Sequence, residues 1–171
     1  MITVQPEKKE DYTAIYEINR LGFGRESEAN LVKSLRKRAD FIRELSLVAV
    51  KDRKVLGHIL FGPIGIQTNK NILPALAPAP MAVHPEFQNR GSGSELLRQG
   101  LERCRNLEQK VVVVVGHPAY YPRFAFTSAR AKGLESPFPV PDEAFMALEL
   151  APGVLSNVQG MVTYPPEFFD V

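Results

Sequence analysis

Residues 81–102 form the segment of the chain whose residue types best suit the binding of a charged ligand. Gly91 and Gly93 stand here between an apolar stretch and the start of a helical pattern. Glycine lets a backbone approach a ligand without a Cβ in the way. The first N–H groups of a helix have no partner within it and lie at the positive end of its dipole. The spacing therefore predicts an anion site suited to a pyrophosphate, to which Arg90 and Arg98 could add charge.

Three interpretations of this loop are open from its residues. An ordinary strand-to-helix turn also uses glycines and binds nothing. A dinucleotide fingerprint, G-x-G-x-x-G, would need a small residue at Leu96 and an acid at the end of the next strand, where His117 and Pro118 stand. The third is a coenzyme A loop with the signature Q/R-x-x-G-x-G/A, which the chain matches in full with Gln88-Asn89-Arg90-Gly91-Ser92-Gly93.

The loop and its surroundings resemble the GCN5-related N-acetyltransferases, known as the GNAT superfamily. At that family's spacing, the hexapeptide follows the strand end Met81-Ala82-Val83-His84-Pro85, and residues 111–115 form a later valine strand. The segment 117–126 is similar to the family's tyrosine-containing motif. The resemblance covers nearly the whole chain and implies an α/β (α+β) fold in one domain over 1–171, with the cofactor core at about 72–128. It also implies a mixed central sheet, flanked by helices and split near the cofactor strand.

The same resemblance implies that acetyl-CoA is the cosubstrate. Its pantetheine arm is expected along the strand end at Met81, Ala82 and Val83, as an added strand would lie. In the family, a backbone N–H at the position of Met81 polarises the thioester carbonyl. Pro80 has no N–H, which helps to separate this strand from its neighbour. The pyrophosphate is expected on the loop amides, at Gln88, Asn89, Arg90, Gly91, Ser92, Gly93 and Ser94.

Tyr121 stands where the family has its proposed general acid, five residues before Phe126. A phenol has an unperturbed pKa of about 10, so it stays protonated at neutral pH and could donate to the coenzyme A thiolate. Tyr120 is the second candidate, and the alternative is that both tyrosines only pack against cofactor or core. Ala125 stands where the family has glycine, and Pro122 follows Tyr121, so we expect a tight or shifted short helix here.

The general base is not identified by any pattern. Some family members have a glutamate on the strand that leads to Met81, but residues 72–83 contain no carboxylate. Glu28, which the family uses near the acceptor, and His117, at the end of the valine strand, are the two candidates. The alternative interpretation is that Glu28 is a solvated helix residue and that His117 is a structural histidine. The base could also be a water molecule, or be unnecessary for an amine that binds neutral. The His and Cys spacing predicts no metal site.

Hydrophobic periodicity predicts the elements that must position these residues. Predicted helices cover residues 12–21, 27–40, 91–107 and 119–124, and predicted strands cover 2–4, 45–50, 55–66, 72–83, 111–115 and 145–150. Pro74, Pro78 and Pro80 predict that their strand is irregular, bulged or partly unpaired. The aromatic tail, 164–171, is expected to pack back onto the body of the protein.

Composition narrows the classes of protein further. The chain has 171 residues, of which 44% are hydrophobic, and this suits one compact domain with a core. A net charge of +2 argues against a nucleic-acid-binding protein. Cys104 is the single cysteine and is predicted to be a buried core thiol. No segment has the roughly 20 apolar residues of a membrane span, and no signal peptide is recognised, so we expect a cytoplasmic protein without a membrane partner.

A non-catalytic acyl-CoA-binding module of the same fold is the main alternative to an enzyme. The carboxylate-free strand favours the module, and Tyr121 favours the enzyme. A dinucleotide oxidoreductase is a more distant alternative. The acceptor amine, of a small molecule or a peptide, is not readable from the residues expected around it: Phe23, Arg25, Glu26, Glu28, Phe138 and Asp142. A homodimer is common in the family and is possible here.

Overall fold

The computed structural model describes residues 1–171, which divide into two compact units. Unit 1 comprises Met1–Gly62, Pro78–Arg103 and Pro166–Val171, and unit 2 comprises Pro63–Ala77 and Cys104–Pro165. Three elements run from one unit into the other: β3 (Lys54–Gln67), β4 (Ile72–Val83) and α3 (Ser92–Asn106).

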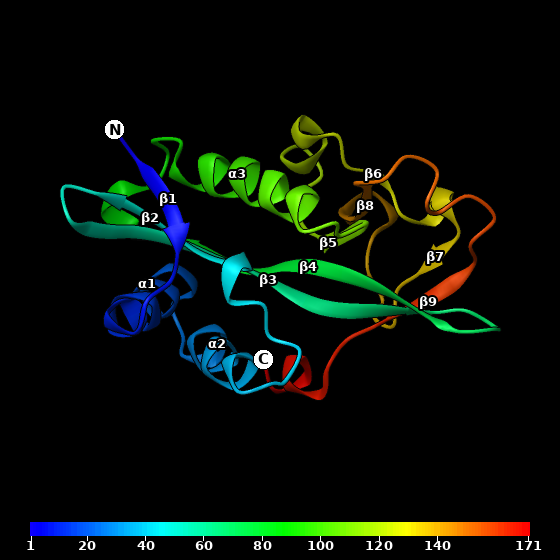
Figure 1. Ribbon diagram of the computed structural model, residues 1–171, viewed down its shortest axis with the longest axis horizontal. Coiled ribbons are helices and arrows are strands. Elements are labelled where there is room, and N and C mark those ends of the chain that lie inside the picture. The colour runs from blue at the N-terminus through cyan, green and yellow to red at the C-terminus, as the bar shows by residue number, and fades with distance from the viewer. The chain divides into compact units, whose positions relative to one another are not determined.

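The strands form one mixed sheet of nine members, labelled in Figure 1. The remaining strands are β1 (Thr3–Pro6), β2 (Ser46–Lys51), β5 (Val111–Val115), β6 (Thr127–Ser128), β7 (Leu134–Glu135), β8 (Phe145–Glu149) and β9 (Gly160–Thr163). The hydrogen-bonded order is β1-β2-β3-β4-β5-β8-β6, with β9 paired to β3 and β7. The predicted α/β fold with a mixed central sheet and flanking helices is confirmed.

In unit 1, β2 and β3 form an antiparallel hairpin, with Leu47 opposite Ile59. Its turn is Asp52-Arg53, and both residues have positive φ, at 51° and 65°. Two such residues in succession are typical of a type I′ turn, whose twist matches that of a hairpin. The polar stretch between the predicted strands 45–50 and 55–66 therefore forms the turn of a hairpin.

Side chains along this hairpin alternate between the two faces of the sheet, and in unit 1 helices cover both faces (Figure 1). Val48 and Leu60 point to α1 (Tyr12–Phe23) and α2 (Ser27–Arg36), where they share a buried cluster with residues of both helices. Their neighbours in sequence, Leu47 and Phe61, point to α3 on the other face. There Gly100 allows close packing, because a Cβ at this position would overlap the ring of Phe61.

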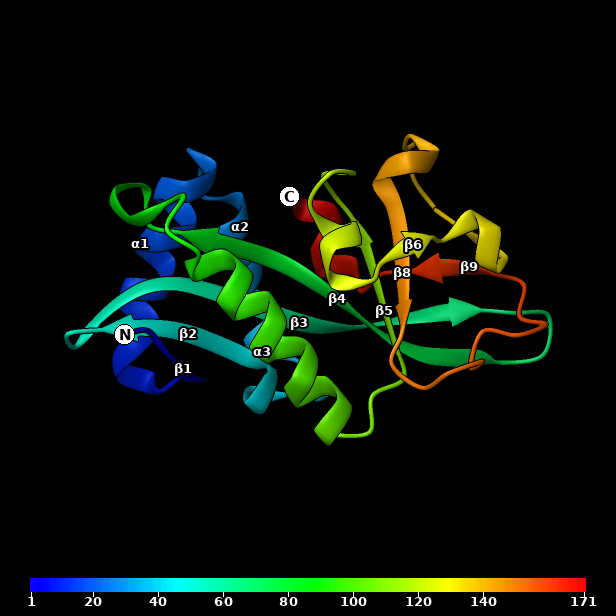
Figure 2. The ribbon, with the colours of Figure 1, turned by 90° about the horizontal axis from the view of Figure 1, so that it is seen from above.

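In unit 2, β5 lies between β4 and β8, as Figure 2 shows. Its pairing with β8 is antiparallel over five residues, whereas its pairing with β4 is one parallel residue pair, Leu76 with Val112. The first four valines of β5 are buried and Val115 is 41% exposed. The valine run therefore forms a strand, as predicted, and this strand is covered along most of its length.

The element boundaries differ from prediction mainly in α2 and in the last third of the chain. α2 ends at Arg36 and not at residue 40, because Lys37 and Arg38 donate to carbonyls three residues back and so close the helix. β6, β7 and β9 were not predicted, since segments of two to four residues are too short to show a period. β4 is one continuous strand despite its prolines.

Two smaller predictions on packing are confirmed. The tail forms a short 3₁₀ helix, Pro166–Asp170, in which Phe168 packs against the buried cluster that includes α2, and Glu167 pairs with Arg38 at 3.0 Å. Cys104 is fully buried, and burial raises the pKa of its thiol to about 12, so it is not a reactive thiolate at neutral pH. None of the helices is both long and apolar enough to cross a membrane.

Candidate functional site

The end of β4 in unit 1 holds Met81, Ala82 and Val83, the residues predicted to lie along the pantetheine arm. The next residue, His84, donates its backbone N–H to the Leu56 carbonyl at 2.8 Å, which fixes the strand end against β3. Gly57 of β3 lies so close that a Cβ there would stand 3.2 Å from the Ala82 carbonyl oxygen. The hydrogen bond to Leu56 and the close approach of Gly57 therefore fix the position of the strand end within unit 1.

The loop after β4 is tied back to that strand by its signature glutamine. Gln88 Nε2 donates to the Val83 carbonyl at 3.1 Å. Asn89 and Gly91 adopt left-handed backbone conformations, with φ of 63° and 87°. This region favours glycine and tolerates asparagine, so the residue types of the signature are the ones that this loop conformation needs.

α3 begins at Ser92, immediately after the loop. Its first turn is closed by Glu95, whose N–H donates to the Gly91 carbonyl at 3.0 Å. The amides of Ser92 and Gly93 precede that bond and so have no carbonyl partner within the helix. The first amides of this helix of 15 residues lie at the positive end of its dipole, which is the backbone geometry that an anion site would need.

Of the two arginines predicted to add charge near this loop, only Arg90 is without a carboxylate partner. Arg98 pairs with Glu95 at 2.8 Å, and the hydrogen bond from Arg98 is the main cause that lowers the pKa of the Glu95 carboxyl. The positive charge of Arg98 is therefore compensated within α3. Arg90 forms no ion pair, and its guanidinium lies 5.7 Å from the centre of the Phe87 ring.

Glu28 is not the solvated helix residue that was its alternative interpretation. It is 6% exposed, at the start of α2 in unit 1. Arg25 holds its carboxylate with two hydrogen bonds, from Nε at 2.9 Å and from Nη2 at 2.5 Å. The hydrogen bond to Glu28 is also the main cause that raises the pKa of Arg25. A proton acceptor at Glu28 would therefore have to act beside a bound guanidinium.

Tyr121 lies in unit 2 and is 9% exposed. Burial raises the pKa of its phenol to about 12, and the neighbouring Tyr120 adds to the shift. Its ring packs edge-on against Tyr120 and Phe126, with centroids 5.2 and 5.5 Å apart. Gly116 makes room for this ring, because a Cβ there would collide with it. The phenol is therefore protonated and rigidly held at neutral pH.

The short helix that carries Tyr121 is tight, as expected. It is a 3₁₀ helix, Tyr121–Phe124, and the Ala125 N–H closes it by donating to the Pro122 carbonyl at 3.1 Å. Ala125 has a φ of 74°, which is the left-handed conformation that glycine adopts without strain. The alanine at this position therefore stores some backbone strain, of order 1–2 kcal/mol.

His117 is exposed, and its hydrogen bonds lie within a turn of unit 2. Its Nδ1 accepts a hydrogen bond from the Ala119 N–H at 3.3 Å, and its carbonyl accepts one from the Tyr120 N–H at 3.1 Å. A neutral imidazole whose Nδ1 accepts carries its proton on Nε2, so the lone pair that a base would use is occupied. These contacts favour the structural interpretation of His117.

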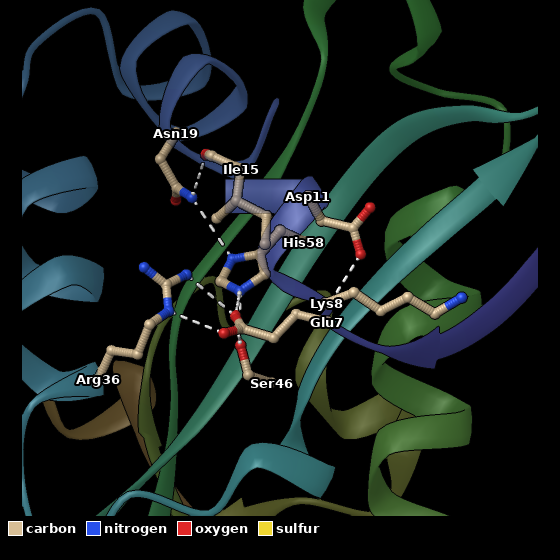
Figure 3. Close-up of polar contacts among 8 residues, drawn as sticks. All are labelled: Glu7, Lys8, Asp11, Ile15, Asn19, Arg36, Ser46 and His58. Carbon is tan, nitrogen blue, oxygen red and sulfur yellow. Dashed lines mark hydrogen bonds and ion pairs between the residues drawn. The ribbon is translucent and has the colours of Figure 1, made fainter. Parts of the chain in front are cut away.

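A buried polar network in unit 1 was not predicted (Figure 3). Glu7 accepts from Arg36 Nε at 2.7 Å and from the Ser46 hydroxyl at 2.5 Å, and the Ser46 hydroxyl lies 3.0 Å from His58 Nε2. Asn19 Nδ2 lies 3.4 Å from the other ring nitrogen of His58. The hydrogen-bonded pairs of this network are 12 to 39 positions apart in sequence, so no local pattern could reveal them.

This network combines a serine, a histidine and a carboxylate, but it is structural. Glu7, Ser46 and His58 are each at most 1% exposed, so no substrate can reach the serine. Burial lowers the pKa of His58 to about 3, with a contribution from the charge of Arg36, and the ring is therefore neutral. Through its residues the network joins β2 and β3 to α1, α2 and the residue after β1. No group of three or more His, Cys, Asp or Glu side chains within residues 1–171 could hold a metal ion.

Comparison with known proteins extends the signature match to most of the chain. A sequence model of the acetyltransferase (GNAT) domain family matches residues 3–129. The chain is 38% identical over 136 residues to the uncharacterized N-acetyltransferase YjhQ of Escherichia coli K12, covering 79% of this chain and 75% of that protein. It is 33% identical over 159 residues to the uncharacterized N-acetyltransferase YhbS of the same strain, covering 92% and 93%.

Two solved structures are similar over nearly the full length. The E. coli YhbS structure, in complex with CoA, has a TM-score of 0.89 and 30% identity, and the match covers 98% of this chain and 92% of that one. A GNAT family acetyltransferase from Brucella melitensis, in complex with acetyl-CoA, has a TM-score of 0.79 and 26% identity, with 98% of each chain covered. Because the family model matches more than half of the chain, and two relatives above 30% identity cover most of it, the chain belongs to the GNAT superfamily of acetyltransferases.

Proposed function

We propose that this protein is an acetyl-CoA-dependent N-acetyltransferase that moves the acetyl group to the amine of a small molecule or a peptide. The observation that carries the proposal is the geometry from Met81 to Ser94, where a fixed strand end leads through left-handed loop residues to the first amides of α3. Relatives that match 98% of this chain were crystallised with CoA and acetyl-CoA. The family match, residues 3–129, includes segments of both units, which supports a single N-acetyltransferase domain.

The donor would bind through main-chain groups more than through side chains. The amides of Gln88, Asn89, Arg90, Gly91, Ser92, Gly93 and Ser94 would hold the pyrophosphate. The pantetheine arm would lie along Met81, Ala82 and Val83, with the Met81 N–H directed at the thioester oxygen. Gln88 would act by shaping the loop, since its side-chain amide already bonds to Val83.

Transfer would proceed by direct attack of the amine. The nitrogen lone pair attacks the thioester carbon, a C–N bond forms, and the C–S bond breaks as the thiolate leaves. The attacking nitrogen loses one proton to a base or to water. Tyr121 donates its phenol proton to the thiolate sulfur and regains a proton from solvent. With a pKa of about 12, the Tyr121 phenol keeps this proton over the whole neutral range.

Glu28 and His117 remain the proposed candidates for the base, and their contacts distinguish them. Glu28 is a buried carboxylate with Arg25 as its partner, whereas the Nδ1 of His117 already accepts a hydrogen bond. We therefore rank Glu28 first. Glu28→Gln should lower turnover at subsaturating amine and shift the pH profile of kcat/KM, and His117→Ala should change neither. If both variants match the wild type, either water accepts the proton or the amine binds neutral and needs no base.

The proposal is tested by following thiol release from acetyl-CoA with a panel of amines. Tyr121→Phe should lower kcat by about 10²–10⁴-fold, the usual range for loss of a general acid, and leave the Kd for CoA unchanged. Tyr164→Phe is the matched control, since Tyr164 also lies in unit 2 and burial also raises its pKa to about 12. Equal turnover in both variants would remove Tyr121 from the mechanism. Binding of acetyl-CoA without thiol release for any amine would favour a non-catalytic acyl-CoA-binding module.

A further inference from the structure

The side chain of His84, the residue after β4, closes the turn that leads to the signature loop. Its Nδ1 accepts a hydrogen bond from the Glu86 N–H at 3.1 Å, and its carbonyl accepts one from the Phe87 N–H at 2.8 Å. Pro85 has no N–H, so these are the first two backbone donors after His84. The imidazole therefore caps the 3₁₀ turn Pro85–Phe87 at its start.

The backbone of His84 is fixed independently of its side chain. Its N–H donates to the Leu56 carbonyl at 2.8 Å, and its ψ of 132° lies in the range that a residue before proline favours. α1 also packs closely on the strand end, since a Cβ on Gly22 would stand 3.2 Å from the Cβ of Ala82. Removal of the imidazole should therefore leave the strand end in place and affect the turn that follows.

The ring of His84 also contacts the aromatic residue of this turn. It packs edge-on against Phe87, with the ring centroids 5.6 Å apart. Phe87 in turn lies near the Arg90 guanidinium, which is 5.7 Å from the centre of its ring. His84, Phe87 and Arg90 thus form a row of contacts from the strand end to the middle of the signature hexapeptide.

The capped turn determines where the signature loop begins. Gln88, the first residue of the hexapeptide, follows the turn directly and donates to the Val83 carbonyl at 3.1 Å. The left-handed residues of the loop come next, and α3 begins at Ser92. Two side-chain hydrogen bonds, one from Gln88 and one to His84, thus hold the start of the loop against the end of β4.

We propose that His84 is a positioning residue for acetyl-CoA binding, whose imidazole holds the 3₁₀ turn so that the loop amides are correctly directed before the ligand arrives. This inference rests on the proposed function, because it concerns the same loop. A protein whose binding conformation is only partly populated has its affinity reduced by that fraction. Loss of the cap lowers this fraction, so association becomes slower. Dissociation stays the same, because the bound complex keeps its contacts.

The test measures the Kd for CoA by calorimetry and the two rate constants by surface plasmon resonance on the immobilised protein. His84→Ala should raise the Kd about three- to tenfold, as expected for one lost capping hydrogen bond, and mainly through slower association. His84→Asn should recover most of the wild-type Kd, because the side-chain oxygen of asparagine also accepts from the N–H two residues on. Faster dissociation in both variants would mean that His84 contacts CoA directly, and would overturn the positioning role.

Hydrogen exchange tests the cap in the protein without ligand. The Glu86 amide should exchange with solvent faster in His84→Ala than in the wild type, and His84→Asn should restore slow exchange. Equal exchange rates in all three proteins would mean that the imidazole does not hold the turn, and would overturn the inference whatever the affinity for CoA.

Ser136→Ala is the matched control, because Ser136 has the same kind of contact in unit 2. Its hydroxyl oxygen accepts from the Phe138 N–H at 3.1 Å, with Pro137 between them. This variant should keep the wild-type Kd and both rate constants. An unchanged Kd in His84→Ala, or an equal rise in Ser136→Ala, would overturn the role of His84 and leave the proposed function intact. A wild type that binds no CoA would overturn the proposed function, and with it this role.

Discussion

Two groups of ionisable side chains in unit 1 differ in how their charges are compensated. In the buried network, Glu7 accepts hydrogen bonds from Arg36 and Ser46, and Ser46 contacts a neutral His58. Around a pocket of about 330 Å³ in unit 1, which we call the basic pocket, Lys51, Lys54 and Arg90 are exposed and have no carboxylate partner. The first group has the residue types of a hydrolase triad and no access for a substrate. The second has ordinary surface residues and an electrostatic potential that a ligand can use.

The difference shows which property marks a binding site in this protein. Residue type alone would select the serine, histidine and glutamate, because such residues perform catalysis elsewhere. Burial and compensation instead assign them to stability, because a buried charge costs free energy unless it is paired. Uncompensated donors remain at the loop amides and at the basic pocket, and both lie at the start of α3.

The largest expected effect comes from breaking the buried network. Glu7→Ala leaves the half-buried charge of Arg36 without its partner, so the free energy of unfolding should fall by about 3–5 kcal/mol. Urea denaturation measures this loss. Glu7→Leu/Arg36→Met, which removes both charges, should recover part of it.

Glu17→Ala is the control for an exposed pair on α1, and it should leave stability almost unchanged because solvent screens the Glu17–Arg20 pair. The Lys51→Ala/Lys54→Ala variant should also unfold like the wild type. A loss in either control as large as that in Glu7→Ala would remove the distinction between the two groups.

The next effect is a pH dependence of stability from His58. Its pKa is about 3 in the folded protein, against an ordinary value of 6.5, because burial disfavours the charged ring. The unfolded chain therefore binds a proton below pH 6.5 that the folded protein does not bind. The stability contribution is complete above pH 6.5 and declines toward pH 3, with a slope of about 1.4 kcal/mol per pH unit.

Denaturation curves at several pH values, for the wild type and for His58→Gln, measure this slope. The variant should show a shallower decline between pH 6 and pH 4, whatever its stability at neutral pH. Parallel curves for the two proteins would mean that His58 does not titrate between the folded and unfolded states.

The smallest expected effect is the dependence on salt concentration, which again distinguishes the basic pocket from the buried network. The Debye length falls from about 10 Å at 0.1 M salt to about 3 Å at 1 M, so exposed cations lose much of their reach. The Kd for CoA should therefore rise several-fold over this range. The loss of stability in Glu7→Ala should stay the same, because the buried pair is screened little. A salt-independent Kd would argue that no exposed cation contacts the ligand.

The sequence predicted the helices and long strands well because their periods extend over many residues. α1 ends at Phe23 and is followed by Gly24 in the left-handed conformation, with φ of 70°, and the β2–β3 turn falls at the polar stretch that interrupts two aliphatic runs. The two- to four-residue strands β6, β7 and β9 carry no period and depend on partners distant in sequence. Gly160 of β9, for example, lies so close to Gln67 that only a glycine fits there.

The candidate site was predictable where it depends on local backbone chemistry. Gln88 and Gly91 could be recognised because the loop needs both within one turn, three positions apart. Three features could not be recognised, because each depends on which groups the fold brings together. These are the partner of Glu28, the hydrogen bond on His117 Nδ1 and the network around His58. The basic pocket likewise joins residues 51–54 to residues 87–92, and no spacing rule connects these segments.

The central claim, that the amides at the start of α3 hold the diphosphate of acetyl-CoA, is tested most directly by titrating the folded protein with acetyl-CoA in a calorimeter. The account predicts saturable heat for one site per chain and competition by CoA. A protein that unfolds cooperatively, yet gives no heat with acetyl-CoA and no competition by CoA, would contradict it.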